Sequence, residues 1–108
     1  MANEKQEQRT VNGLVLYLCE REYLDGYDRY LDKSIRISPL GDEVVLKQRE
    51  FSIDELSELA ASGDQEGLKE GIFSKFGIND LRSFPGIPKG PYYWIDSEVY
   101  GAIREGSR

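Results

Sequence analysis

The stretch that decides the fold is FSIDELSELAASGDQEGLKEGIFSKFGI, residues 51–78, because its local signals predict two consecutive helices. Ser52, followed three residues later by Glu55, forms a capping box at the start of the first helix. Gly63 is the expected end of this helix, since glycine readily adopts the left-handed conformation that stops a helix. Between these signals, apolar residues recur on one helical face at Ile53, Leu56, Leu59 and Ala60.

The second predicted helix begins at once, with Asp64 as its cap. Gly77 followed by Ile78 is typical of a Schellman ending. Gly67 and Gly71 lie four residues apart in this helix, and each costs about 1 kcal/mol relative to alanine. We therefore expect another backbone or side chain to approach closely there, either inside the domain or in a partner. The buried stripe is predicted at Leu68, Ile72, Phe73 and Phe76.

Residues 11–38 predict an antiparallel pair of strands. The dipeptide Asp25-Gly26 is the one most typical of a two-residue hairpin turn. After it, apolar and polar residues alternate with the period of two that a half-buried strand requires. A helix that ends near residue 26 is the alternative for the first half, although we favour strands. The residues at helical spacing that support this alternative are Tyr23, Tyr27, Tyr30 and Leu31.

Residues 43–49, EVVLKQR, predict a third strand that runs back beside residues 33–38. A three-stranded antiparallel meander results, with one face apolar enough to need a cover. The helical hairpin over residues 52–76 supplies that cover and completes two layers around one core. The expected fold class is therefore α+β.

Residues 78–94 predict a Pro/Gly-rich ordered loop, because proline is excluded from helix interiors and central strands. We expect Phe84 and Trp94 to be buried in the core. Neighbouring side chains point in opposite directions, so at least one of Tyr92 and Tyr93 should be exposed. A short C-terminal helix follows. Asp96 is expected to cap it and Gly106 to end it, and Val99 and Ile103 are its expected buried residues.

The chain of 108 residues is expected to form one domain over residues 11–108, preceded by a flexible polar tail at 1–10. Its longest apolar run, residues 14–19, is far shorter than the ~20 residues that a membrane span needs. The first ten residues resemble neither a secretion signal nor a transit peptide. The expected location is the cytoplasm.

The composition excludes much catalytic chemistry, because the chain has no histidine. Imidazole-based acid–base catalysis, Ser–His and Cys–His triads and histidine–zinc sites are therefore excluded. The single cysteine, Cys19, is expected to be a small buried apolar residue, with no partner for a disulfide. GIPKGP at residues 86–91 lacks the spacing of a phosphate-binding loop. Neither a cofactor site nor a metal site is expected.

The negative charge is concentrated in one part of the chain. Residues 50–70 carry seven acidic side chains and one lysine, which accounts for the whole net charge of −6. Most of these acidic side chains are expected on the solvent faces of the two helices, where they keep the protein soluble or attract a basic partner. Residues 84–94 are the second feature of interest, since aromatic residues beside a cation are typical of protein-binding hot spots and of base-stacking surfaces.

These features favour a small acidic, non-catalytic protein-binding or regulatory module. These features also agree with a phage-type or regulatory inhibitor that docks on a basic, nucleic-acid-handling partner. The sequence does not decide whether the protein forms a homodimer. One alternative is a nucleic-acid-binding regulator with a degenerate helix-turn-helix. The second helix, however, begins with acidic residues, and their negative charge would repel the phosphates of a nucleic acid. The other is a small carboxylate-dependent enzyme. The candidate partner-binding residues are Asp54, Glu58, Glu66, Glu70, Lys89, Tyr92 and Tyr93.

Overall fold

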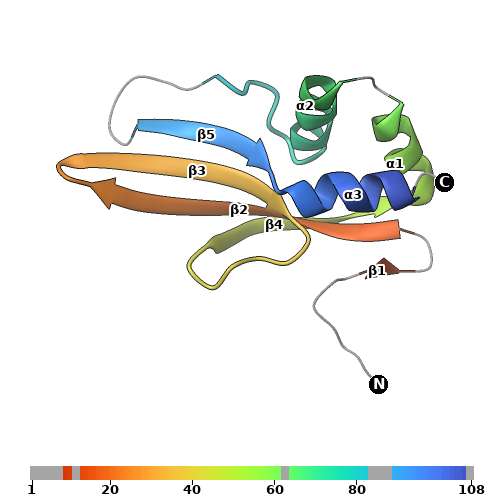
Figure 1. The fold of residues 1–108 in the computed structure, drawn as a ribbon, viewed down its shortest axis with the longest axis horizontal. Helices are drawn as coiled ribbons and strands as arrows, with labels where there is room; N and C mark the ends of the chain where they lie inside the picture. Colours follow the sequence, from red (N-terminus) through yellow and green to blue (C-terminus); the bar gives the residue numbers. More distant parts are fainter. Residues whose placement is uncertain (1–8, 11–12, 62–63, 83–88, 107–108) are drawn as a thin grey trace.

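The computed structural model describes residues 9–10, 13–61, 64–82 and 89–106, which form an α+β fold (Figure 1). Helices lie on one side of a mixed β-sheet, whose longest strands extend well past them. No helix in these ranges is long and apolar enough to cross a membrane. The elements in chain order are β1 (Arg9–Thr10), β2 (Gly13–Asp25), β3 (Asp28–Arg36), β4 (Val44–Ser52), α1 (Ile53–Ala60), α2 (Gln65–Lys75), β5 (Lys89–Ile95) and α3 (Ser97–Gly106).

The sheet has the order β4–β2–β3–β5, with β1 paired to the first residues of β2. The pairs β2–β3 and β2–β4 are antiparallel, whereas β3 and β5 are parallel. The predicted meander is therefore only partly correct. Residues 44–52 form a strand, but it lies beside β2 and not beside residues 33–38, and β5 adds a strand that was not expected.

The position of β4 follows from the apolar character of β2. In a meander, β2 would be an edge strand, and its residues before Tyr17, which β3 does not reach, would lack a long neighbouring strand. With β4 on its second side, β2 becomes central and buries Leu14, Leu16, Leu18 and Cys19 almost completely. Removal of this apolar surface from water favours the observed order, at about 25 cal/mol per Å².

The core lies between the sheet and the three helices. Alternate residues of the strands point to this side, including Leu16 on β2, Ile35 on β3 and Ile95 on β5. The helices contribute a second set of buried residues, and α1 packs more extensively against α3 than against α2. The expected simple helical hairpin is thus part of a three-helix layer. The buried helical residues are Leu56, Leu59, Ile72, Phe73, Val99, Ala102 and Ile103.

The local signals of α1 are present as predicted. The Ser52 hydroxyl accepts a hydrogen bond from the Glu55 backbone N–H at 3.1 Å, and the Glu55 carboxylate accepts one from the Ser52 N–H at 3.0 Å. Ile53 and Ala60 are exposed, so the apolar stripe is narrower than predicted. The predicted stop at Gly63 lies outside the described residues.

The signals of α2 are also confirmed. Asp64 accepts a hydrogen bond from the Gly67 N–H at 2.8 Å. Gly77 has φ +90°, and the Ile78 N–H donates to the Phe73 carbonyl at 2.9 Å, as in a Schellman ending. A Cβ on Gly71 would lie 2.9 Å from Leu59 Cδ2, so this glycine permits close packing of α2 against α1 inside the domain.

The end of the predicted loop is a strand. Residues 89–95 form β5 at the edge of the sheet, where proline is tolerated because one side of the strand makes no ladder hydrogen bonds. Trp94 is half-buried on the sheet face opposite the helices, so its predicted place in the core is wrong. Tyr92 is 44% exposed, as one of the two tyrosines was expected to be. Phe84 lies outside the described residues.

The most exposed part of the sheet is the hairpin formed by the distal halves of β2 and β3, residues 21–32, which we call the hairpin arm. It projects past the helices, at the left of Figure 1. Residues 22–29 are all exposed. The strand prediction for this region is confirmed, with the two-residue turn at Gly26–Tyr27, one position later than expected. Residues 9–10, expected in the tail, form β1.

Candidate functional site

Five aromatic side chains, Tyr17, Tyr23, Tyr30, Tyr92 and Trp94, lie on the sheet face that the helices leave uncovered, and Tyr17 is the one at its proximal end. Tyr23 lies directly opposite Tyr30 across the β2–β3 pair, and Trp94 lies opposite Ser34 across β3–β5. Directly opposite residues in a sheet point to the same face, as do residues two apart in one strand. We call Tyr23, Tyr30, Tyr92 and Trp94 the aromatic face.

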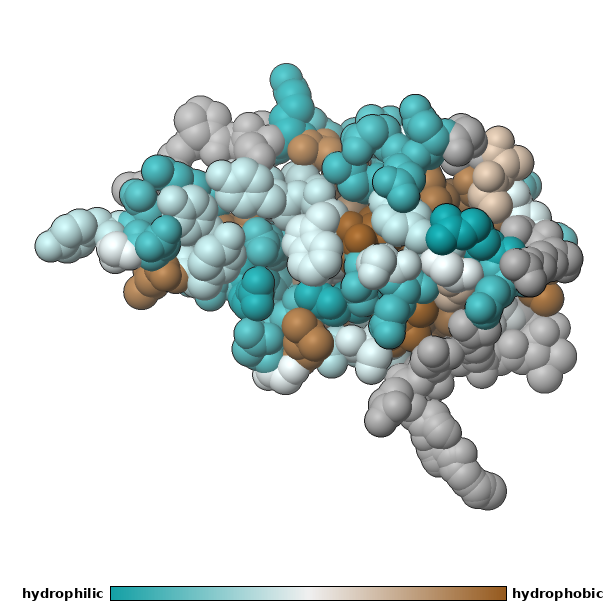
Figure 2. Space-filling view, viewed as in Figure 1, coloured by the Kyte–Doolittle hydropathy of each residue, from teal (hydrophilic) through white to brown (hydrophobic). Residues whose placement is uncertain are grey.

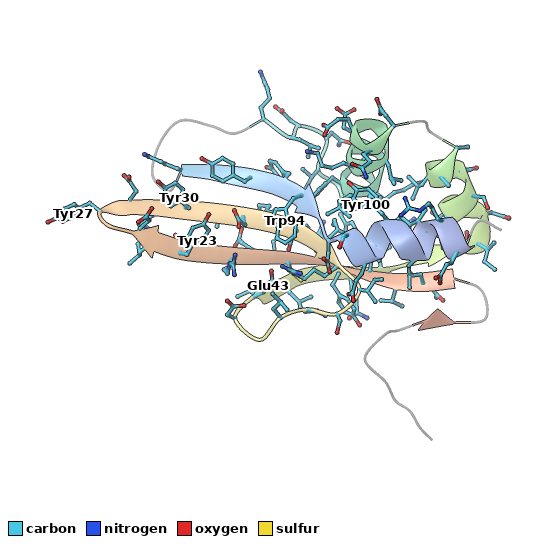
Figure 3. The ribbon with its side chains drawn as sticks, in the orientation of Figure 1. Tyr23, Tyr27, Tyr30, Glu43, Trp94 and Tyr100 are labelled. Carbon is cyan, nitrogen blue, oxygen red and sulfur yellow. The ribbon has the colours of Figure 1, made fainter. Side chains whose placement is uncertain are left out.

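The tyrosine rings of this face form a continuous row across three strands. The Tyr23 and Tyr30 rings are stacked with centroids 5.4 Å apart, and the Tyr30 and Tyr92 centroids are 6.5 Å apart. Tyr23 is 40% exposed and Tyr92 44% exposed, so the row is open to solvent. Figure 3 places Tyr23 and Tyr30 along the hairpin arm, with Trp94 nearer the body.

The surface of the arm combines these rings with charged groups. In the space-filling view, pale, weakly polar side chains lie beside strongly hydrophilic ones over the arm (Figure 2). Tyr27 occupies the tip and is fully exposed, and Leu24 beside it is 70% exposed. An element that exposes several large apolar and aromatic side chains close together is typical of an interaction surface.

Each cation on the aromatic face lies over a ring of the same chain. The Arg21 guanidinium is 5.4 Å from the centroid of Tyr23, and the Lys89 ammonium is 5.7 Å from that of Tyr30. Arg36 lies 4.7 Å from the Trp94 centroid. Cation–π contacts of this kind hold aromatic rings in defined orientations.

The same cations are also neutralised by carboxylates. Arg21 lies 3.3 Å from Asp42 and 3.7 Å from Asp32, and Lys89 lies 3.4 Å from Asp28. The hydrogen bond to Asp28 raises the pKa of Lys89 above its ordinary value, so the lysine stays charged. The positive charge of the face is therefore already compensated within the chain.

The proximal end of the face is covered by residues 37–43, which cross β2 between β3 and β4. The Glu43 side chain is 2% exposed and fastens this segment. Its carboxylate accepts hydrogen bonds from Arg36 Nε at 2.9 Å, Ser34 Oγ at 3.3 Å and the Leu40 N–H at 3.2 Å. Burial first, and the Glu43 carboxylate second, raise the pKa of the Cys19 thiol to about 11. Cys19 is thus an inert buried residue.

The structure brings together two of the residues selected from the sequence. Lys89 and Tyr92 both lie beside Tyr30 on the aromatic face. Tyr93 points to the helix side and packs edge-on against Phe73, with ring centroids 5.4 Å apart. The selected acidic residues are exposed on the helices, away from the aromatic face; they are Asp54 and Glu58 on α1 and Glu66 and Glu70 on α2.

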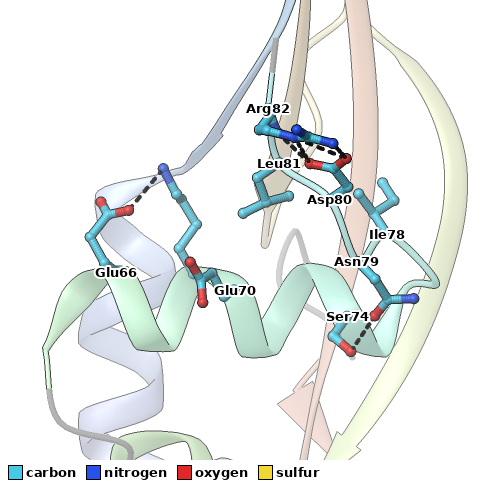
Figure 4. A pocket seen from close by; sticks show the side chains of 9 residues that line it. Glu66, Glu70, Ser74, Ile78, Asn79, Asp80, Leu81 and Arg82 are labelled. Atoms are coloured by element: carbon cyan, nitrogen blue, oxygen red, sulfur yellow. Dashed lines mark hydrogen bonds and ion pairs between the residues drawn. The ribbon is translucent and has the colours of Figure 1, made fainter. Parts of the chain in front are cut away.

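Glu66 and Glu70 line an open groove of about 590 Å³ between α2 and residues 78–82 (Figure 4). Its charges largely pair with one another. Lys69 lies 3.6 Å from Glu66, and Arg82 lies 2.8 Å from Asp80. Hydrogen bonds from Arg82 lower the pKa of Asp80 to about 2. The groove therefore presents mostly paired charges.

Sequence reasoning missed Tyr23 and Tyr30 as members of the candidate site. The signal was available in the hairpin register, because both lie at equal distances from the turn and must face each other once the turn is placed at Gly26–Tyr27. The same tyrosines also fit helical spacing, which is the alternative to the favoured pair of strands. The contributions of Arg21 and Arg36 depend on contacts between strands that no local pattern reports.

Within the described ranges, no group of three or more Cys, Asp or Glu side chains is placed to hold a metal ion. Comparison of the chain with protein-family models, curated proteins and solved structures found no match.

Proposed function

We propose that this protein is a small acidic, non-catalytic binding module that captures a protein partner with a basic surface through its aromatic face. The observation that carries the proposal is the row of Tyr23, Tyr30 and Tyr92 on a projecting arm. Tyrosine, tryptophan and arginine are the residues most enriched in the energetic centres of protein interfaces. The rings are held by cross-strand stacking and cation–π contacts, so little conformational entropy is lost when a partner binds.

The charge around the rings supports a basic partner. Asp25, Asp28 and Asp32 alternate along β2 and β3 in the positions that share the face with the tyrosines. The protein as a whole carries a net charge of −6. Asp28 and Asp32 are already paired with Lys89 and Arg21. The attraction of a basic partner therefore rests on Asp25 and on the net charge of the whole protein, and opposite overall charge would accelerate the encounter.

A nucleic-acid-binding regulator is less well supported. Base stacking would suit the tyrosines, but phosphates need cations that are free to contact them. Arg21 and Lys89 are paired with carboxylates. The first turn of α2, which would be the recognition helix of a helix-turn-helix, carries Glu66 behind the Asp64 cap.

A carboxylate-dependent enzyme is also less well supported. A general acid needs a carboxyl group whose pKa is raised, usually by burial. The carboxyl groups whose pKa values are clearly shifted, Glu55 and Asp80, are both shifted downward to about 2 by hydrogen bonds from arginine and the backbone. The aromatic face supplies no nucleophile activated by a neighbouring base.

Affinity capture from a lysate of the source organism tests the proposal. The immobilised full chain is compared with the Tyr23→Ala/Tyr92→Ala variant and with a matched charge-reversal variant on the helices, Asp54→Lys/Glu58→Lys/Glu66→Lys/Glu70→Lys. Proteins with basic surfaces should be captured by the wild type and lost with the tyrosine variant. If the tyrosine variant still captures these proteins and the helix variant does not, the binding site lies on the acidic helices and the proposal is overturned.

A nucleic acid control separates the two binding classes. A fluorescently labelled single-stranded oligonucleotide is titrated with the protein at about 200 mM salt, where contacts that rest on phosphate charge are strongly weakened. If the protein binds the oligonucleotide at micromolar concentration and this binding depends on Tyr23 and Tyr92, the protein is a nucleic-acid-binding regulator and the protein-partner proposal is wrong. If a partner is captured and handles nucleic acid, loss of its activity on addition of this protein would identify the module as an inhibitor.

A further inference from the structure

Arg21 occupies one cation position on the aromatic face. Its guanidinium lies 5.4 Å from the centroid of the Tyr23 ring, and its terminal nitrogens lie 3.3 Å from Asp42 and 3.7 Å from Asp32. The fit is incomplete, because Arg21 Nε is buried and has no hydrogen-bond partner within the described part of the chain. A buried donor without an acceptor destabilises the arrangement that contains it. Arg21 is thus held by a ring and two carboxylates, but not in an optimal way.

Lys89 occupies a second position of the same kind. Its ammonium lies 5.7 Å from the centroid of the Tyr30 ring and 3.4 Å from an oxygen of Asp28. A ring face beside a carboxylate attracts any guanidinium or ammonium group, whether it belongs to this chain or to another one. The two positions therefore show the chemistry of the ligand that the aromatic face accepts, namely an arginine or lysine side chain.

Both cations are held weakly enough to be exchanged. The side chains of Lys89 and Asp28 are 51% and 49% exposed, and those of Arg21 and Asp42 are 33% and 64% exposed. An exposed ion pair typically changes an equilibrium constant by about fivefold or less. A cation–π contact at an exposed site has an effect of similar size. A partner that brings its own cation can therefore replace either side chain at a small cost.

The third cation of the face, Arg36, is not exchangeable in this way. Its side chain is 8% exposed, and its Nε lies 2.7 Å from Glu43, whose side chain is 2% exposed. Breaking a buried ion pair costs far more than breaking an exposed one. Exchange is therefore restricted to the Tyr23 and Tyr30 rings of the hairpin arm.

We propose that Arg21 and Lys89 are internal competitors, which an arginine or lysine side chain of the partner must displace from the Tyr23 and Tyr30 rings. Displacement transfers the neighbouring carboxylates from the chain's own cations to those of the partner. The apparent affinity for the partner falls in proportion to the fraction of molecules whose cation positions are free. This competition rests on the proposed function, whose ligand it specifies, and it keeps binding reversible.

Titration of a fluorescently labelled, arginine-only peptide with the full chain tests the competition. The measurement is made at about 150 mM salt, where exposed charges more than about 8 Å apart are largely screened from one another. Arg21→Gln/Lys89→Gln removes both competitors and should bind the peptide at least ~5-fold more tightly than the wild type, since it leaves the rings and carboxylates free. A lower or unchanged affinity would overturn the proposal, because the two cations would then support binding or have no part in it.

A matched variant separates local competition from net charge. Lys75→Gln/Arg82→Gln also removes two positive charges, from cations that pair with Glu55 and Asp80 and lie on α2 and in the segment beside it. This variant should bind the peptide less than ~2-fold more tightly than the wild type. An equal gain in the two double variants would mean that only the net charge matters, and the competition would be refuted.

The contribution of the rings is measured in the variant that lacks the competitors. Adding Tyr23→Leu/Tyr30→Leu to Arg21→Gln/Lys89→Gln keeps apolar side chains on the arm but removes both ring faces. The gain in affinity should then be largely lost. If the full gain persists, the peptide binds the carboxylates alone and the rings do not form the cation positions, contrary to the proposal. Melting temperatures show whether each variant is folded.

The outcomes are separable from those of the capture experiment. If neither the wild type nor Arg21→Gln/Lys89→Gln binds the peptide, the competition is refuted, whereas tyrosine-dependent capture of a partner would still support the proposed function. If the double variant binds the peptide more tightly and the wild type captures no partner, the cation positions are confirmed and the proposed function fails.

Discussion

Arg36 Nε lies 2.7 Å from a carboxylate oxygen of Glu43, and both side chains are less than a tenth exposed. This ion pair joins the end of β3 to the segment that crosses β2. It therefore holds the crossing in place and puts β4 on the far side of β2. It also orients Arg36 over the Trp94 ring at the proximal end of the aromatic face.

Removal of the Glu43 carboxylate should strongly destabilise the fold. Glu43→Ala leaves the buried Arg36 with only its longer ion pair to Asp96, at 3.6 Å, and removal of one partner from a buried ion pair typically costs about 3–5 kcal/mol of unfolding free energy. Equilibrium urea unfolding measures the change. Arg82→Ala, which removes the partner of the exposed Asp80, is the control and should leave the urea midpoint unchanged. A Glu43→Ala variant as stable as the wild type would show that the crossing is held by packing alone.

Glu55 should make part of the stability dependent on acid pH. Hydrogen bonds from Arg49 and from the Ser52 backbone lower the pKa of Glu55 from about 4.5 to about 2. Because the folded-state value is the lower one, this contribution is complete above about pH 4.5 and is lost as the pH falls toward 2. In urea unfolding between pH 6 and 2, wild type should therefore lose more stability than Glu55→Gln. Parallel curves for the two proteins would contradict the assignment.

The cap of α1 should contribute through the Ser52 hydroxyl. Ser52→Ala leaves the Glu55 backbone N–H without its acceptor and should cost about 1 kcal/mol of unfolding free energy. Ser52→Asp keeps an acceptor at the same position and serves as the matched control. Both are measured by thermal or urea unfolding. Equal losses in the two variants would show that the side-chain acceptor is not what stabilises this helix end.

Two helical glycines should respond differently to alanine. A Cβ on Gly101 of α3 meets no atom within 4 Å, so Gly101→Ala should stabilise the protein by about 0.5–1 kcal/mol through helix propensity. A Cβ on Gly71 would lie 2.9 Å from Leu59 Cδ2, so the same change there should give less benefit or a loss. Melting temperatures compare the two. A larger gain at Gly71 would mean that α1 and α2 are less tightly packed than described.

Cys19 should not react with thiol reagents in the native protein. Its side chain is 0% exposed, and its pKa is raised to about 11, so at pH 8 the thiol is both inaccessible and protonated. A chromogenic disulfide reagent should give no rapid signal until denaturant is added, and then one thiol per chain. Rapid native reaction would place Cys19 at the surface.

The parts of the fold that could be predicted from sequence are those governed by contacts within a few residues. Ser52, Asp64 and Gly77 start or end helices through hydrogen bonds that span three to five residues, and all three predictions are confirmed. In the candidate site, Tyr92 and Lys89 were selected because aromatic residues and a cation are close in sequence. Their partner Tyr30 could not be selected in this way, because it comes from a different strand.

The amino-acid sequence by itself determined where α1 and α2 begin and where α2 ends, and that the net charge is negative, and it favoured a strand over a helix for the apolar residues Leu14, Leu16 and Leu18. Only the tertiary structure decided the strand order and which aromatic residues share a face. The physical reason is the range of the interactions. Caps and turns are satisfied locally, whereas the choice between two positions for β4 depends on burial of β2 and on the pairing of Glu43 with Arg36, which come together only after the chain has crossed the sheet.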